Sequence, residues 1–156
     1  MGTNGYGTNM GTPKQNGLAE RFNRTILERV RCMLLSAGLP KIFLAEAAMT
    51  VVYLINKCPL TTLNFKTPEE IWFGHPPSLK QLKVFGCVAY AHIRQDKLEP
   101  RAVKCIFLGY PEEVKGYKLW CLEAGFKRCL VSRDVVFNES EMAYKTKPSM
   151  VQYCSE

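Results

Sequence analysis

The sequence lacks the closely spaced cysteine and histidine pairs from which zinc sites are built. It has two histidines, and its seven cysteines include no pair with the C-x-x-C spacing. Structural zinc sites take four Cys or His ligands, usually from such closely spaced pairs, so we expect no zinc site. Cys121 and Cys129 lie symmetrically about Gly125. They could face each other across a hairpin. In a reducing compartment, two buried thiols are favoured over a disulfide between them.

Long hydrophobic runs are also missing. The longest apolar-leaning stretch, residues 45–55, contains Glu46 and Thr50 and is too short to span a bilayer. The N-terminus lacks the basic and then apolar segments of a secretory signal peptide. A chain of 156 residues with 47% hydrophobic residues can bury one ordinary core or two small ones. We expect a globular intracellular protein that makes no contact with membranes.

Positive charge is present in excess, with 21 Lys and Arg against 14 Asp and Glu. The excess is local: residues 11–31 carry five basic and two acidic residues, and residues 80–104 carry six and two. Nucleic acid is the partner that such patches favour. A solvated basic face without a ligand explains the composition equally well.

Helical periodicity dominates the first half. Residues 1–17 hold five glycines and three asparagines, and we assign 1–12 to a flexible leader. Apolar residues then recur with helical period over 18–37, until Gly38 ends the helix. The segment 40–57 is apolar on most sides, which predicts a helix packed between other elements. Thr67 followed by Pro68 and Glu70 predicts a capped short helix over 68–73.

Short β-branched and aromatic runs replace this pattern after residue 77, in the segments 83–93, 103–110, 116–122, 127–131 and 133–137. About five strands in such a short stretch indicate a small antiparallel barrel. Gly86 and Gly109 are the expected bulges or bends. The fold class is therefore α+β, with a helical part over 13–75, a barrel over 78–139 and a loose tail over 140–156.

Glu20 is the residue of most interest in the first helix. Measured from Leu18, Glu20, Arg31 and Arg24 fall at about 200°, 220° and 240° around the helix axis, beside the apolar stripe. Arg29 falls at about 20°, on the apolar side. Glu20 is either a helix-start residue that suits the helix dipole and pairs with Arg24, or one carboxylate of a catalytic cluster.

Several long segments carry a family resemblance. They are GTPKQNGLAERFNRTILERVRCMLLSAGLP, VVYLINKCP, TPEEIWFGHPPSLKQLKVFGCVAY, RAVKCIFLGY, KGYKLW and VSRDVVF. From about residue 11 to 139 the chain resembles the integrase region of Pol polyproteins from copia-type long-terminal-repeat retrotransposons. The resemblance implies the C-terminal helices of a ribonuclease H-like core, then an SH3-like barrel. It also implies that Glu20 matches the third carboxylate of an Asp, Asp, Glu triad.

The chemistry of that family gives the nearby side chains a role. The intact family uses two Mg²⁺ ions, held by three carboxylates, for phosphodiester transfer. Arg24 and Arg31 would then neutralise DNA phosphates, and the side chains of Gln15, Asn16 and Asn23 would donate hydrogen bonds to DNA. The expected phosphate contacts of the barrel are Lys80, Lys83, Arg94, Lys97, Arg101 and Lys104.

The sequence departs from the family at the metal site. Its two aspartates, Asp96 and Asp134, both lie in the β-rich half, and no acidic residue precedes Glu20. Glu20 alone would be an incomplete site, so we expect no bound Mg²⁺ and no catalysis by this chain alone. The hypothesis is a truncated integrase fragment, nuclear if functional, that binds DNA or RNA by descent.

Two alternatives stay open. One is a working non-catalytic DNA- or RNA-binding module. The other is an interaction partner that self-associates or joins intact integrase subunits through helix residues that would normally cover a sheet. Without that sheet, the helices would either pack on each other and on the barrel or self-associate through exposed apolar residues such as Leu18, Phe22, Ile26 and Val30.

Overall fold

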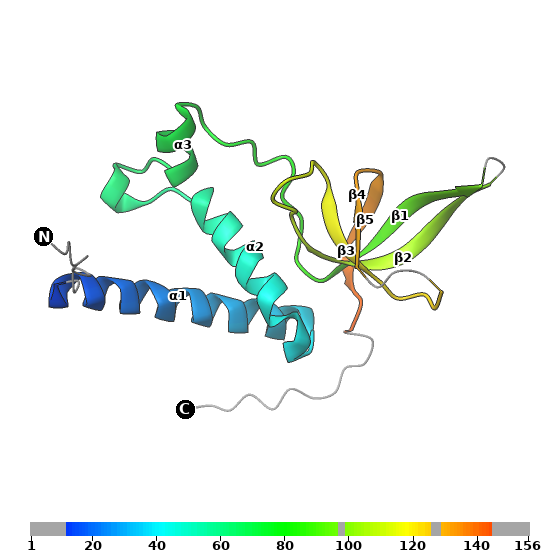
Figure 1. Ribbon diagram of the computed structural model, residues 1–156, viewed down its shortest axis with the longest axis horizontal. Helices are drawn as coiled ribbons and strands as arrows, with labels where there is room; N and C mark the ends of the chain where they lie inside the picture. The colour runs from blue at the N-terminus through cyan, green and yellow to red at the C-terminus, as the bar shows by residue number, and fades with distance from the viewer. Residues whose placement is uncertain (1–11, 97–98, 126–128, 145–156) are drawn as a thin grey trace, which may run out of the picture.

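The computed structural model describes residues 12–96, 99–125 and 129–144 (Figure 1). Helices occupy the first part of the chain and a five-stranded antiparallel sheet the second, so the α+β class is confirmed. The expected leader, apart from Thr12, lies outside the described residues, as does the expected tail from residue 145 onward. Within the described ranges, no helix is both long and apolar enough to cross a membrane.

Helix α1 spans Pro13–Ala37 and confirms the first predicted helix, although it begins earlier than the apolar pattern does. Thr12 precedes it, and the Thr12 backbone N–H donates to Gln15 Oε1 at 3.3 Å. Pro13 suits the first helical position because its missing N–H would have no helical partner. Gly38 ends the helix in the left-handed conformation, with φ of 68°.

A short 3-10 turn, Lys41–Phe43, leads into α2, Leu44–Asn56. The prediction that this segment packs between other elements is confirmed, since α2 shares a core with α1 and β2. Its packed face buries Ala47, Thr50, Val51 and Ile55, whereas apolar residues on its other face, such as Met49 and Val52, are exposed. A second 3-10 turn, Thr61–Leu63, precedes α3, Pro68–Phe73. The predicted cap of α3 is confirmed, because Thr67 Oγ1 accepts a hydrogen bond from the Glu70 N–H at 3.0 Å.

The sheet contains β1 (Cys87–Asp96), β2 (Glu99–Gly109), β3 (Tyr117–Cys121), β4 (Cys129–Ser132) and β5 (Val135–Met142). Its strand order is β4-β3-β2-β1-β5, with antiparallel neighbours. Strand β5 continues through Ser140 into the segment expected to be a tail. Leu130 of β4 and Phe137 of β5 both pack on the buried residues of one inner core, so the sheet is strongly curled.

Both predicted bend positions are irregular. The pairing of β2 with β3 shifts register between Phe107 and Gly109, as a bulge does. Gly86 has φ of 81°, and a side chain there would meet the Cβ of Ala37 in α1. Glycine at this position therefore lets the start of the sheet approach the end of the first helix closely.

The helices and the outer face of the sheet share a second core, which we call the junction core. Val30 and Leu34 of α1, Val51 of α2 and Ile106 and Leu108 of β2 are buried in it. Of the two outcomes expected for these apolar residues, the packing alternative holds at Val30, because α2 and the sheet cover the C-terminal half of α1.

Polar contacts join the same two layers. Thr50 Oγ1 donates to the Leu108 carbonyl at 2.8 Å, and Lys118 Nζ lies 2.8 Å from Glu46 Oε1. The rings of Phe43 and Trp120 meet edge to face at 5.1 Å. The helical part is thus fixed to the sheet by packing, hydrogen bonds and an ion pair.

The expected facing of Cys121 and Cys129 is wrong. Cys129 is exposed and lies opposite Trp120, whereas Cys121 is buried opposite Cys105. The Sγ atoms of Cys105 and Cys121 are 3.4 Å apart. The hairpin between β3 and β4 is offset by one residue from the symmetric pairing, and one residue of offset moves a side chain to the other face.

Candidate nucleic-acid interface

Glu20 lies well inside α1, seven residues after the first helical residue, Pro13. The helix-start interpretation is therefore wrong, because the dipole effect is confined to the first turn. Glu20 is exposed, and no ion pair joins it to Arg24 within the described residues. Neither of the two local stabilising roles considered for this carboxylate is present in the fold.

The exposed side of α1 carries most of the polar residues singled out in the sequence. Glu20, Asn23, Arg24 and Arg31 are all exposed, and we call this set the α1 flank. Successive residues turn by about 100°, so Glu20, Arg24 and Arg31 lie on the flank beside the buried residues of α1, and Asn23 lies above those buried residues, in the exposed N-terminal half of the helix. The flank is therefore an open surface with two guanidinium groups, one carboxylate and one amide.

Three other polar residues of α1 occupy different positions. Gln15 and Asn16 are exposed in its first turn, where Gln15 Oε1 already accepts the Thr12 N–H. Arg29 was expected on the apolar side, but it is exposed. That side faces solvent at Leu18 and Phe22, which are 69% and 52% exposed. Arg29 thus presents its charge on the flank opposite to Arg31.

Three of the basic residues expected to grip phosphates are held by carboxylates. Lys83 pairs with Glu139 at 3.4 Å, Arg101 with Glu123 at 3.1 Å, and Lys104 with Glu141 at 3.2 Å. Such exposed or half-exposed pairs are worth about 0 to 1 kcal/mol, so a phosphate can compete for these cations. Lys80 is exposed. The Arg94 side chain and Lys97 lie outside what the structure describes.

The residues present do not fit a two-Mg²⁺ site. Such a site needs several carboxylate oxygens converging on one point. Across residues 12–96, 99–125 and 129–144, no three His, Cys, Asp or Glu side chains cluster closely enough to hold a metal ion. Glu20 stands on an open helix surface, and we derive no metal-dependent step from it.

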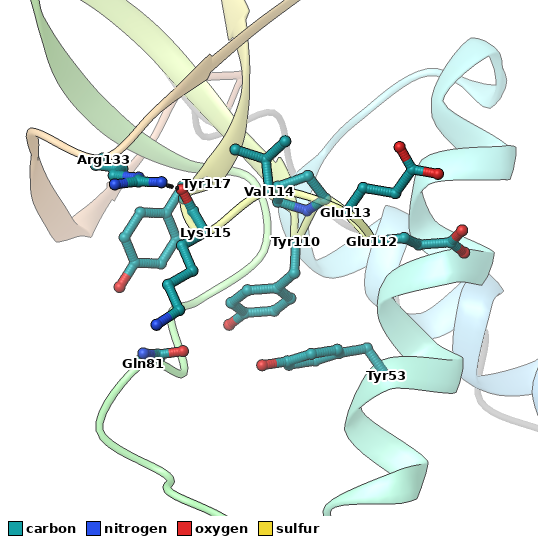
Figure 2. Close-up of a pocket in the computed structure, with 11 residues that line it drawn as sticks. Tyr53, Gln81, Tyr110, Glu112, Glu113, Val114, Lys115, Tyr117 and Arg133 are labelled. Atoms are coloured by element: carbon teal, nitrogen blue, oxygen red, sulfur yellow. Dashed lines mark hydrogen bonds between the residues drawn. The ribbon is translucent and has the colours of Figure 1, made fainter.

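Sequence reasoning missed a pocket where α2 meets the sheet. Tyr53 of α2 stacks on Tyr110 with ring centroids 4.0 Å apart, and Tyr117 lies 6.1 Å from Tyr110. These rings line a cavity of about 470 Å³ together with Lys115 and Arg133 (Figure 2). No local pattern signals it, because its walls come from α2, the β2–β3 loop and the β4–β5 turn.

The curled sheet agrees with an SH3-like domain, and residues 87–151 match the family of the retroviral polymerase SH3-like domain. Over 85% of its length, the chain is 50% identical to the retrovirus-related Pol polyprotein from transposon TNT 1-94 of Nicotiana tabacum. Over 86% of its length, it is 38% identical to the corresponding polyprotein from transposon RE2 of Arabidopsis thaliana. Most of the chain is thus similar to a segment of retrovirus-related Pol polyproteins of transposons, and its β-rich part matches the retroviral polymerase SH3-like domain.

The chain spans about a tenth of the length of these polyproteins, 10% and 9% respectively. It is also 55% identical, over 53% of its length, to an uncharacterized mitochondrial protein of Arabidopsis thaliana, and it covers 69% of that protein. No solved structure matches the chain.

Proposed function

We propose that this chain is part of a transposon integrase and that it binds DNA electrostatically without catalysing strand transfer on its own. Residues 13–75 would be the C-terminal helices of a ribonuclease H-like core, and residues 78–139 its SH3-like domain. The similarity to retrovirus-related Pol polyproteins of transposons supports this origin. A protein that works on chromosomal DNA in this way would act in the nucleus.

The α1 flank is the observation that carries the proposal. Arg24 and Arg31 are exposed on the same side of a helix that is anchored at its other face. Two guanidinium groups on one side of a helix suit the phosphates of a DNA backbone, because phosphate neutralisation dominates non-specific binding to DNA. The exposed Asn23 amide, which precedes Arg24 in the sequence, would donate to the backbone or to base edges.

Glu20 explains why we propose binding rather than catalysis. By resemblance, Glu20 matches the third carboxylate of the integrase triad. In the described part of the chain, no two other carboxylates lie with it to complete a metal site. The purified chain should therefore show no strand transfer or end processing with Mg²⁺ or Mn²⁺. Activity above background that disappears in Glu20→Gln would contradict this part of the proposal.

Binding itself is tested with a labelled DNA duplex at several salt concentrations. The logarithm of the association constant should fall linearly with the logarithm of salt concentration, and unrelated duplexes should bind alike. Equal binding of RNA would favour a general nucleic-acid-binding module. No binding even at low salt would overturn the proposed function.

A second candidate function rests on a different observation. Leu18 and Phe22 lie on one side of α1 and are 69% and 52% exposed, and adjacent exposed apolar side chains favour protein contacts. The chain would then self-associate or join intact integrase subunits. Light scattering tests self-association, which Leu18→Ser with Phe22→Ser should abolish without changing the far-ultraviolet circular dichroism spectrum. A wild-type protein that stays monomeric at high concentration would leave only association with other subunits.

A further inference from the structure

The pocket beside Tyr53 gathers hydrogen-bond donors on one side. The hydroxyls of Tyr53, Tyr110 and Tyr117 point toward the same space as the Lys115 ammonium and the Gln81 amide (Figure 2). Ammonium, phenol and primary amide groups all donate hydrogen bonds. The pocket therefore offers several donors from three separate segments of the chain to one bound group.

Most of these donors are free to bind a ligand. Within the described ranges, the Lys115 ammonium, the Gln81 amide and the hydroxyls of Tyr53 and Tyr117 make no hydrogen bond to another protein group. Tyr110 is different, because its hydroxyl oxygen accepts the Lys83 N–H at 3.0 Å. That bond occupies a lone pair of the oxygen and leaves the hydroxyl hydrogen available for the pocket.

The protein holds these groups in place without a ligand. The near-parallel stack of Tyr53 and Tyr110 fixes both rings, whose planes differ by 19°. The Arg133 Nε donates to the Lys115 carbonyl at 2.8 Å and so fixes the backbone that carries Lys115. Burial raises the pKa of Tyr110 to about 12, so its hydroxyl keeps its proton at neutral pH.

Charge in the pocket is arranged unevenly. Lys115 and Arg133 lie on the side of Tyr117, whereas the carboxylates of Glu112 and Glu113 lie beyond Val114, toward α2 (Figure 2). An anion held by the donors would therefore meet the Lys115 ammonium and not the two carboxylates. The cavity volume of about 470 Å³ lies within the range of roughly 300 to 1,000 Å³ typical of small-molecule sites.

We propose that this pocket binds the phosphate group of a nucleotide, held by Lys115, Gln81 and the three tyrosine hydroxyls. The proposal rests on the proposed nucleic-acid function and adds a discrete phosphate site to the electrostatic surface of α1. The phosphate has two sources, a free phosphate or mononucleotide and an internal phosphodiester of a nucleic acid strand. Oxygen acceptors are common to both, so separate probes are needed.

Nuclear magnetic resonance of the tyrosine ring signals tests the site directly. Inorganic phosphate, a deoxynucleoside monophosphate and a short single-stranded oligonucleotide would be titrated separately at constant ionic strength. The ring signals of Tyr53, Tyr110 and Tyr117 should shift with phosphate and not with sodium chloride or sodium acetate. Equal shifts with acetate, or no shift with any phosphate probe, would overturn the proposal. An effect of the oligonucleotide alone would assign the site to internal phosphodiesters, and an effect of the two small probes alone would assign it to free phosphate.

Matched variants separate the pocket from general charge. Lys115→Ala should weaken binding of the effective phosphate probe by about tenfold, because a hydrogen bond to a charged group is strong. The double variant Tyr53→Phe with Tyr117→Phe keeps both rings and should weaken binding of that probe by about threefold. Lys66→Ala removes the same charge from an exposed residue outside the pocket and should leave binding of the probe unchanged. Equal effects of Lys66→Ala and Lys115→Ala on probe binding would overturn the assignment of phosphate binding to the pocket.

The same variants distinguish this failure from failure of the proposed function. If duplex DNA binds with a steep salt dependence but Lys115→Ala and the double tyrosine variant behave as wild type with every probe, the pocket assignment is wrong and DNA binding stands. If duplex DNA does not bind at low salt while inorganic phosphate still shifts the tyrosine signals, the proposed function is wrong and the site remains a phosphate site.

Discussion

Tyr117 of β3 and Phe137 of β5 contact each other edge to face, with ring centroids 4.8 Å apart, although β2 and β1 lie between their strands in the sheet. Neighbouring strands are about 4.8 Å apart, so a flat sheet would separate these rings by roughly 14 Å. The contact requires a sheet that curls around its inner core. Figure 1 shows the strands converging in this way.

Phe137→Ala should therefore lower the free energy of unfolding by about 2 to 4 kcal/mol, because it removes a ring where opposite parts of the sheet meet. Val136→Ala is the control, since Val136 is 57% exposed on the same strand and should change stability by less than about 0.5 kcal/mol. Urea unfolding measures both values. Equal losses of stability in the two variants would contradict the role assigned to the curl.

The hydrogen bond between Thr50 and Leu108 makes a second prediction. Thr50→Val removes the buried donor to the Leu108 carbonyl and should cost about 1 to 3 kcal/mol, whereas Thr50→Ser keeps the hydroxyl and should cost less. Gly109→Ala would place a methyl group against Thr50 Oγ1 and should destabilise by about 1 to 3 kcal/mol. Thermal unfolding of the three variants is the measurement, and a Thr50→Ser variant as unstable as Thr50→Val would refute the hydrogen-bond explanation.

Stability should fall in alkaline solution. Burial raises the pKa of Cys87 from 9.0 to about 11 and that of Tyr110 from 10.0 to about 12. The folded chain keeps these protons while the unfolded chain loses them, so the stabilisation is fully present below pH 9 and is lost as pH rises toward 12. The hydrogen bond to Glu46 raises the pKa of Lys118 and acts in the same direction.

Urea unfolding between pH 8 and pH 11 measures this loss. Tyr110→Phe should make the decline above pH 10 shallower, because it removes one of the groups that lose protons on unfolding. Tyr144→Phe changes an exposed tyrosine and is the control. A decline of the same steepness in wild type and in Tyr110→Phe would argue against the shifted pKa of Tyr110.

Thiol accessibility offers a fourth prediction, measured in a Cys154→Ser background because Cys154 lies outside the described residues. Cys32, Cys58 and Cys129 are exposed and should react with a thiol reagent at once. Cys87, Cys105 and Cys121 are buried and should react only after unfolding. A rapid reaction of more than three thiols in the native protein would contradict the burial of Cys87, Cys105 and Cys121 in the inner core.

The elements and their order could be predicted from the sequence because they depend on local pattern. The helical period over α1, the Thr67 cap and the alternation of the strands each involve residues that are close in the chain. The interpretation of Glu20 as a helix-start residue failed because Thr12 and Pro13 begin the helix before its apolar pattern does.

Contacts between distant segments could not be predicted in this way. Tyr53 meets Tyr110, and Lys83 meets Glu139, only because α2 and the linker before β1 pack against the sheet. The same packing buries Val30, which has the apolar pattern of exposed Leu18. The helical pattern of α1 does not show which of its apolar residues are covered, because that depends on how far α2 and the sheet extend along the helix.

The salt dependence of duplex binding in three variants tests the central claim, that DNA lies along the α1 flank. Arg24→Ala with Arg31→Ala should reduce the slope of log association constant against log salt concentration by about 2, because each neutralised phosphate contributes about 0.9 to that slope. Arg29→Ala removes an equal charge from the opposite flank of the same helix and should change the slope little. Glu20→Gln should leave binding unchanged or slightly tighter, since it removes a charge of the same sign as DNA. If Arg29→Ala reduced the slope by about 1, as much for one removed charge as the double variant does for each of its two, the claim that DNA lies along the α1 flank would be contradicted.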